Sequence, residues 1–231
     1  MWELAALIVC NSFILPGVAE TAIALVDIVT EETFLITVLM TLSRVIIGLA
    51  LGVLLGIILA VLSHHIPVAN ALISPFVSVI KSTPVASFII VLWAILSGYS
   101  LPIFIAFLMV MPIVWQNMLD GYAYVDKNLG EVCDVFEFSY PKRVKYLIVP
   151  TLSRYLIPAT ITSVGLAWKA EIAAEIIDFT DKSIGYYINY SKKDFDSPRV
   201  FAWTVIIIFF SFVLEKFTKS LLRGYQNEPQ S

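Results

Sequence analysis

Cysteine, histidine and charge are all scarce in this chain of 231 residues, which has two Cys, two His and only 14% Asp, Glu, Lys and Arg. Cys10 lies in an apolar segment and Cys133 in a charged one, so the pair is not expected to form a disulfide. His64 and His65 are adjacent but have no acidic or cysteine neighbour that would complete a metal site. We therefore expect no metal, no redox chemistry and no cofactor.

Several functional motifs are also missing. No Gly-x-x-x-x-Gly-Lys-Ser/Thr sequence occurs, so this chain has no loop of its own to hold ATP phosphates, and any driving ATPase is expected to be a separate subunit. The apolar segments contain no Ser/His/Asp or Cys/His arrangement that would support catalysis within a membrane. The formal net charge is only −3 and no basic stripe is present, which argues against nucleic acid as a partner.

Apolar residues, in contrast, make up 59% of the chain, which predicts an integral membrane protein with several spans. Windows of about 20 residues predict an all-α polytopic fold with six transmembrane helices, at 2–16, 34–62, 70–97, 101–119, 155–178 and 200–222. The first is short and ends at Pro16, so five spans are the alternative. A kink is expected near Lys81 to Pro84. We expect one membrane domain over 1–231.

The segment 120–154 is a charged interruption between two apolar stretches. Its first half has apolar residues at steps of three and four, which predicts a stripe along a short helix: Val125, Leu129, Val132, Cys133 and Phe136. After Ser139 and Pro141, a second short amphipathic helix is predicted, with Val144, Leu147 and Ile148 on one face. Two such helices predict a binding surface for a partner outside the bilayer. The alternative is a connector that lies on the membrane surface.

Basic residues favour one orientation of the chain. They are numerous in the 120–154 loop and recur at Lys219 and Arg223 in the tail, whereas the 17–33 loop has only acidic charges. Four basic residues in the 179–199 loop, Lys182, Lys192, Lys193 and Arg199, reduce this asymmetry. The loop and the C-terminal tail are therefore expected to be cytoplasmic, and six spans would place both termini inside.

From Glu131 to Pro150, the loop resembles the coupling loop of ABC importer permeases, in which a glutamate is followed by two alanines, a glycine and a distal proline. Val132 and Cys133 stand where that motif has alanines, and Glu137 stands where it has glycine. The resemblance implies that the loop couples the chain to an ATPase, through Glu131, Val132, Cys133, Phe136, Glu137, Leu147 and Pro150.

The resemblance covers nearly the whole chain and is to the nitrate, sulfonate, taurine and thiamine-precursor branch of binding-protein-dependent permeases. The other matching segments are Asn11 to Pro16, Ser43-Arg44, Pro84, Gly165 to Lys169, Ala173 to Glu175, and Ser183 to Tyr186. It implies a type I importer permease of the bacterial inner membrane that works by alternating access. The implied partners are a second permease copy, two ATP-binding cassette ATPases, an extracellular substrate-binding protein and the lipid bilayer.

Charged residues within the fifth predicted span are the second functional feature. Trp168, Glu171 and Glu175 fall at i, i+3 and i+7, on one helical face, with Lys169 on another. Each intramembrane charge costs about 2.5 to 3.5 kcal/mol on insertion scales, so these side chains are not expected to face lipid. Arg44 in the second predicted span could meet either carboxylate or a substrate anion.

We interpret all five as candidates for the translocation path, with interhelical contact as the alternative, above all for Glu175. Two carboxylates would favour a cation or a hydrogen-bond donor as the solute. Gly48, Gly52 and Gly56 recur every four residues, which predicts close approach of another helix. A secondary transporter or a non-transporting scaffold remains the rival to a permease, and the sequence does not identify the solute.

Overall fold

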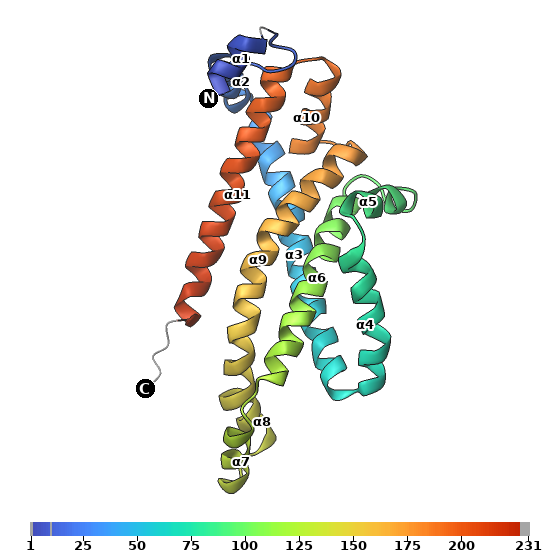
Figure 1. Ribbon diagram of the computed structural model, residues 1–231, viewed down its shortest axis with the longest axis vertical. Coiled ribbons are helices and arrows are strands. Elements are labelled where there is room, and N and C mark those ends of the chain that lie inside the picture. The colour runs from blue at the N-terminus through green and yellow to red at the C-terminus, as the bar shows by residue number, and fades with distance from the viewer. Residues whose placement is uncertain (1, 10, 227–231) are drawn as a thin grey trace. The chain divides into compact units, whose positions relative to one another are not determined.

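The computed structural model describes residues 2–9 and 11–226, in which helices are present and strands are not (Figure 1). The all-α class is therefore confirmed. In chain order the elements are α1 (Trp2–Val9), α2 (Val18–Thr30), α3 (Phe34–His65), α4 (Pro67–Ser82), α5 (Val85–Trp93), α6 (Ser100–Ala123), α7 (Lys127–Val135), α8 (Tyr140–Arg143), the π-helical segment η1 (Val144–Ile148), α9 (Val149–Asp178), α10 (Ile184–Lys193) and α11 (Ser197–Gln226).

Four of the described helical stretches are long and apolar enough to cross a membrane, and the bent pair α4–α5 gives a fifth if it counts as one span. The four are Phe34–His65, Ser100–Ala123, Tyr140–Asp178 and Ser197–Leu222. A sixth span is not found among the described residues, because 2–16 does not form one helix, and the predicted alternative of five spans agrees with the count in which α4–α5 is one span. Helix α1 has 8 residues, about 12 Å of length against a hydrocarbon core of about 30 Å. Five crossings, an odd number, would also place the two ends of the chain on opposite sides.

The kink predicted near Lys81 to Pro84 is confirmed. Thr83 (φ −86°, ψ 132°) and Pro84 (φ −59°, ψ 134°) are not helical and separate α4 from α5. The cause is local, since a residue before proline is disfavoured in the helical region and proline has no N–H to continue the hydrogen-bond ladder. The Thr83 hydroxyl donates to the Val79 carbonyl at 2.7 Å and so caps the end of α4.

The chain divides into two compact units. Unit 1 holds 1–47, 84–106 and 168–214, and unit 2 holds 48–83, 107–167 and 215–231. Helices α3, α6, α9 and α11 each contribute residues to both units.

In unit 2, α3 and α6 approach closely at two glycines. A Cβ atom on Gly52 would lie 2.6 Å from the Val110 Cβ, and one on Gly56 would lie 2.8 Å from the Val114 Cβ. No real side chain accepts such distances, so the predicted glycine face is confirmed at these two positions.

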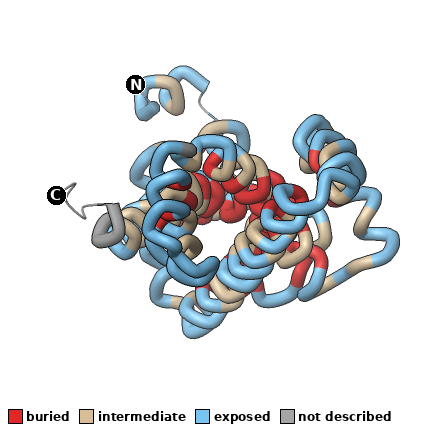
Figure 2. The backbone as a smooth tube through the Cα atoms, turned by 90° about the horizontal axis from the view of Figure 1, so that it is seen from below, coloured by how far each residue is buried: buried red, intermediate tan, exposed pale blue. Residues whose placement is uncertain are grey.

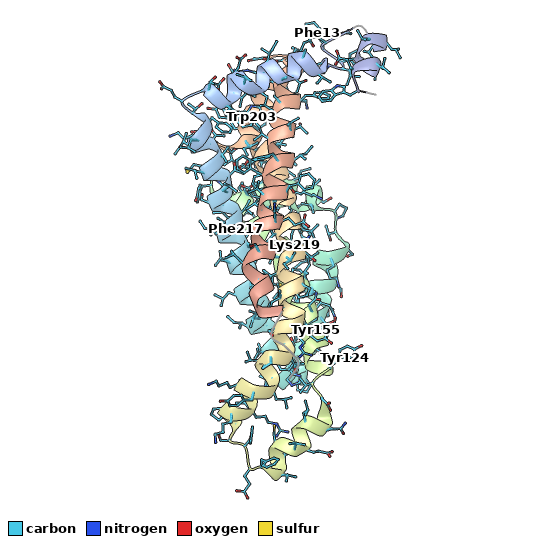
Figure 3. The ribbon with its side chains drawn as sticks, turned by 90° about the vertical axis from the view of Figure 1, so that its left-hand side faces the viewer. Phe13, Tyr124, Tyr155, Trp203, Phe217 and Lys219 are labelled. Atoms are coloured by element: carbon cyan, nitrogen blue, oxygen red, sulfur yellow. The ribbon has the colours of Figure 1, made fainter. Side chains whose placement is uncertain are left out.

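In unit 1, Trp203 of α11 is buried between two aromatic rings, Tyr187 of α10 at 5.6 Å and Phe34 of α3 at 6.3 Å (Figure 3). This contact joins three helices of the unit.

Large parts of the spans are exposed within the single chain, as the pale blue segments in Figure 2 show. The most apolar part of α6 is 61% buried, but that of α11 is only 17% buried. Such apolar, exposed helix faces are stable only against lipid or another protein.

Candidate functional site

The first candidate site is the charged loop 120–154, for which the sequence predicts a coupling role and which unit 2 builds from α7, α8, η1 and the start of α9 (Figure 1). Asp126 caps α7, because its side chain accepts from the Asn128 N–H at 2.8 Å. The Tyr124 and Tyr155 rings stack with centroids 5.8 Å apart, which fixes the entry to the loop against α9 (Figure 3).

Glu137 ends α7 in the left-handed conformation, with φ 48°. The Phe138 N–H donates to the Cys133 carbonyl at 2.9 Å, and the Glu137 N–H donates to the Asp134 carbonyl at 3.1 Å. These two bonds form a Schellman motif, in which the left-handed position is normally glycine. The turn therefore lies where the motif of related coupling loops has glycine, and Glu137 adopts it at a cost of about 1 to 2 kcal/mol.

Arg143 of α8 ties the second short helix to the first. Its Nη1 donates to Asp134 Oδ1 at 2.8 Å, and its Nη2 donates to the Gly130 carbonyl at 3.0 Å. The ion pair is exposed and worth little by itself, but both contacts hold α7 and α8 in one arrangement.

The predicted coupling residues divide into two sets. Cys133 and Leu147 are buried and pack the loop together, whereas the others are exposed: Glu131, Val132, Phe136, Glu137 and Pro150. The structure adds exposed apolar residues of the loop that the periodicity did not single out, among them Val135, Phe138 and Tyr140. Val135 lies off the predicted stripe and Phe138 lies between the two helices, so a helical repeat could not find them, whereas Tyr140 begins α8 four positions before Val144.

The second candidate site is a buried polar cluster in unit 1, centred on Glu175, which is 0% exposed. Its Oε1 accepts from Arg44 Nη1 at 2.7 Å and from the Thr41 hydroxyl at 2.9 Å. Its Oε2 accepts from the Gly185 N–H at 3.1 Å, and Arg44 Nη2 donates to the Asp181 carbonyl at 3.2 Å. One carboxylate thus connects α3, α9 and the start of α10.

Gly185 is required for this arrangement. A Cβ atom there would collide with the Glu175 Cβ and would lie 2.6 Å from the Ile176 backbone nitrogen. Thr41 supports the same contact, because its hydroxyl also accepts from the Ile184 N–H at 3.1 Å. Thr41 was not predicted, although a polar residue three positions before Arg44 in an apolar span was a usable signal.

Glu171 lies one turn before Glu175, is also 0% exposed, and has no hydrogen-bond partner for either carboxylate oxygen among the described residues. Trp168 is fully buried and its indole N–H donates to the Ile207 carbonyl of α11 at 3.2 Å. Lys169 is exposed. The structure therefore places both glutamates and Trp168 on the buried face of α9, and Lys169 away from it.

Within the described residues, no group of three or more His, Cys, Asp or Glu side chains is arranged to hold a metal ion. The chemistry of both candidate sites is that of contact and charge.

Long apolar spans, an exposed helical loop and a buried ionic cluster are typical of a membrane transport subunit. Residues 52–226 match the family of binding-protein-dependent transport system inner membrane components, and the chain belongs to this family. It is therefore the permease subunit of an ABC transporter and a multi-pass membrane protein, which decides against the secondary transporter and the scaffold.

Named relatives agree with this assignment. The chain is 23% identical over 222 residues to a Methanocaldococcus jannaschii protein named as an ABC transporter permease, and the alignment covers 94% of this chain and 83% of the relative. It is 26% identical over 120 residues to the bicarbonate transport system permease protein CmpB of Synechococcus elongatus, covering 52% of this chain and 43% of that protein.

The fold is similar to a solved structure of an amino acid ABC transporter with histidines, with a TM-score of 0.66 and 18% identity. That match covers 83% of this chain and 91% of the other. ABC transporter permeases of this family work with ATPase and substrate-binding protein partners.

Proposed function

We propose that this chain is the permease of an importer in a bacterial cytoplasmic membrane, paired with a second permease copy. In this proposal it receives a small organic solute from an extracellular binding protein and releases it into the cytoplasm by alternating access. Two cytoplasmic ATP-binding cassette subunits supply the energy, because this sequence has no phosphate-binding loop of its own. The chain functions as one membrane domain over 1–231.

The observation that carries the proposal is the construction of the coupling loop. Arg143 and the turn at Glu137 hold α7 and α8 together, so the loop is suited to move as a unit. Tyr140–Asp178 counts as one membrane-crossing stretch, so a push on α8 would pass directly into α9.

Val132 and Phe136 supply the exposed apolar contact with the ATPase in this scheme, with Glu131, Glu137 and Pro150 around them. A buried aromatic anchor carries much of the binding energy in many protein interfaces. Cys133 and Leu147 are buried and do not touch the ATPase in this scheme; they hold the loop together by packing inside it.

Replacing Phe136 with Asp tests the contact. The variant should insert into the membrane normally but lose copurification of the ATPase and ATP-driven uptake, because a carboxylate would be desolvated at the interface. The matched control is Phe195→Asp, since Phe195 is 74% exposed against 71% for Phe136 and lies in unit 1, between α10 and α11. Unchanged copurification in Phe136→Asp, or equal loss in both variants, would contradict the proposal.

For the translocation path we propose Arg44, Trp168, Lys169, Glu171 and Glu175, with different tasks. The hydrogen bonds of Glu175 to three residues, Thr41, Arg44 and Gly185, support the interhelical alternative for this residue, which then acts by holding α3, α9 and α10 together. Glu171 is the candidate for an interaction with the solute, since neither carboxylate oxygen meets the geometry of a hydrogen bond within the described residues and Arg44 already pairs with Glu175.

Glu171 can accept from a hydrogen-bond donor on the solute, and once the path opens to water and the group ionises it would attract a cation and repel an anion. Glu171→Gln should therefore reduce uptake while the assembled complex and its ATPase subunits remain. Normal uptake by this variant, or efficient uptake of an anionic solute by the unaltered protein, would show that the charge argument is wrong.

A further inference from the structure

The N-terminal helices α1 and α2 precede the segment matched to the permease family, which begins at residue 52. Only Glu31, Glu32 and Thr33 separate α2 from the membrane-spanning helix α3. The end of α2 must therefore lie close to the membrane surface. In Figure 3, α2 runs across the upper end of α11 and meets the start of α3 without continuing its direction.

Helix α2 has three distinct faces when its residues are placed at 100° intervals. One face packs on unit 1 through Thr21, Ala24 and Ile28, which are buried. An acidic edge carries Glu20 and Asp27, which are both exposed. The remaining arc is exposed and mostly apolar: it carries Val18, Ala19, Ala22, Ile23, Val26 and Val29, with Thr30 as its one polar residue at the end of the helix.

The rotation of α2 is fixed by contacts at both of its ends. Before the helix, the Trp2 indole N–H donates to the Pro16 carbonyl at 3.0 Å, and the Trp2 ring stacks on Phe201 of α11 at 5.8 Å. After it, Glu31 forms an ion pair with Arg199, also of α11. These contacts keep the apolar arc pointed away from the unit.

We propose that the apolar arc of α2 is inserted among the acyl chains of the leaflet that surrounds the N-terminal end of α3, with the acidic edge in water. The helix then acts as an in-plane membrane anchor. The exposed apolar surface of α2 is continued by the first turns of the membrane-spanning helix α3, which expose Leu35 and Leu39 among others. This continuity supports lipid, and not another protein, as the partner of the apolar arc.

The charges of the N-terminal segment also indicate which lipid headgroups it can bind. The first 43 residues contain no Lys or Arg, so the anchor has no basic group to bind anionic headgroups. Its attachment is apolar, and neutral phospholipids should suffice.

The test compares two adjacent positions of the full chain, assembled with its ATPase in nanodiscs of phosphatidylcholine. A nitroxide is attached in Val26→Cys or in Asp27→Cys, each in a chain with Cys10 and Cys133 replaced by Ala. Oxygen is concentrated among acyl chains, whereas a neutral nickel chelate stays in water. We expect the label at 26 to collide several-fold more with oxygen than with nickel, and the label at 27 to show the reverse.

Two results would overturn the proposal. Equal access of the nickel chelate to both labels would place the apolar arc in water. Protection of the label at 26 from both reagents would mean that protein covers the arc, either a second copy of this chain or another subunit.

Discussion

Replacement of Glu175 by Gln is the perturbation whose effect the structure defines most closely. The carboxylate accepts from Arg44, Thr41 and the Gly185 N–H in a site with no exposure to solvent. A glutamine oxygen can still accept from Arg44 and Thr41. Its amide nitrogen would then face the Gly185 N–H, so that a donor meets a donor.

The larger effect falls on Arg44, which is 1% exposed and would keep its positive charge without the carboxylate that pairs with it. Removing one partner of a buried ion pair typically destabilises a protein by about 3 to 5 kcal/mol. Glutamine preserves the shape of the side chain, so we expect a loss of about 3 kcal/mol. For a chain of this size, that corresponds to a fall of about 6 to 12 °C in the unfolding midpoint.

Thermal unfolding of the purified permease in detergent measures this fall, with Glu171→Gln as the matched control. Glu171 is equally buried, on the same helix, but its oxygens have no hydrogen-bond partner among the described residues. Its neutral replacement removes no bond, so the midpoint should stay the same or rise. Equal midpoints for Glu175→Gln and the unaltered chain, or equal losses in both variants, would refute this reasoning.

Two further substitutions test the backbone geometry. Gly185→Ala should lower the yield of folded protein, because its Cβ would lie 2.6 Å from the Ile176 nitrogen. Gly165→Ala has no atom within 4 Å of the added Cβ, so this variant should fold normally, with a free energy of unfolding that rises by up to about 1 kcal/mol. Size-exclusion profiles compare the yield of folded protein for the two variants. Glu137→Gly should raise the free energy of unfolding of the permease by about 1 kcal/mol without loss of ATPase copurification, because glycine adopts φ 48° freely. A lower free energy of unfolding would show that the Glu137 side chain stabilises the loop by more than its left-handed backbone costs.

The sequence predicted much of the fold because long apolar runs have few alternatives in a membrane. It failed at 2–16, since an apolar window does not show whether a helix is continuous. Val9 ends α1 after 8 residues, and the extended backbone of Gly17 starts α2 as a separate helix.

Within the candidate sites, local features were predictable and long-range partners were not. Helical spacing correctly put Glu171 and Glu175 on one buried face of α9. It could not decide which of the two pairs with Arg44, 131 residues away from Glu175, because the register between two helices depends on packing that neither sequence segment shows alone. The resemblance aligned Glu137 with the glycine of the motif, and the Schellman bonds show that the chain turns at this position.

The most direct test of the account is photocrosslinking from position 136 in the full chain, in membranes that also contain the ATPase. A benzoylphenylalanine at this position, which is 71% exposed in unit 2, should form an adduct whose mass is that of the permease plus an ATP-binding cassette subunit. The same probe at 195 should not form it. An adduct with lipid alone at 136 would contradict the account, because the loop would then be a connector lying on the membrane surface.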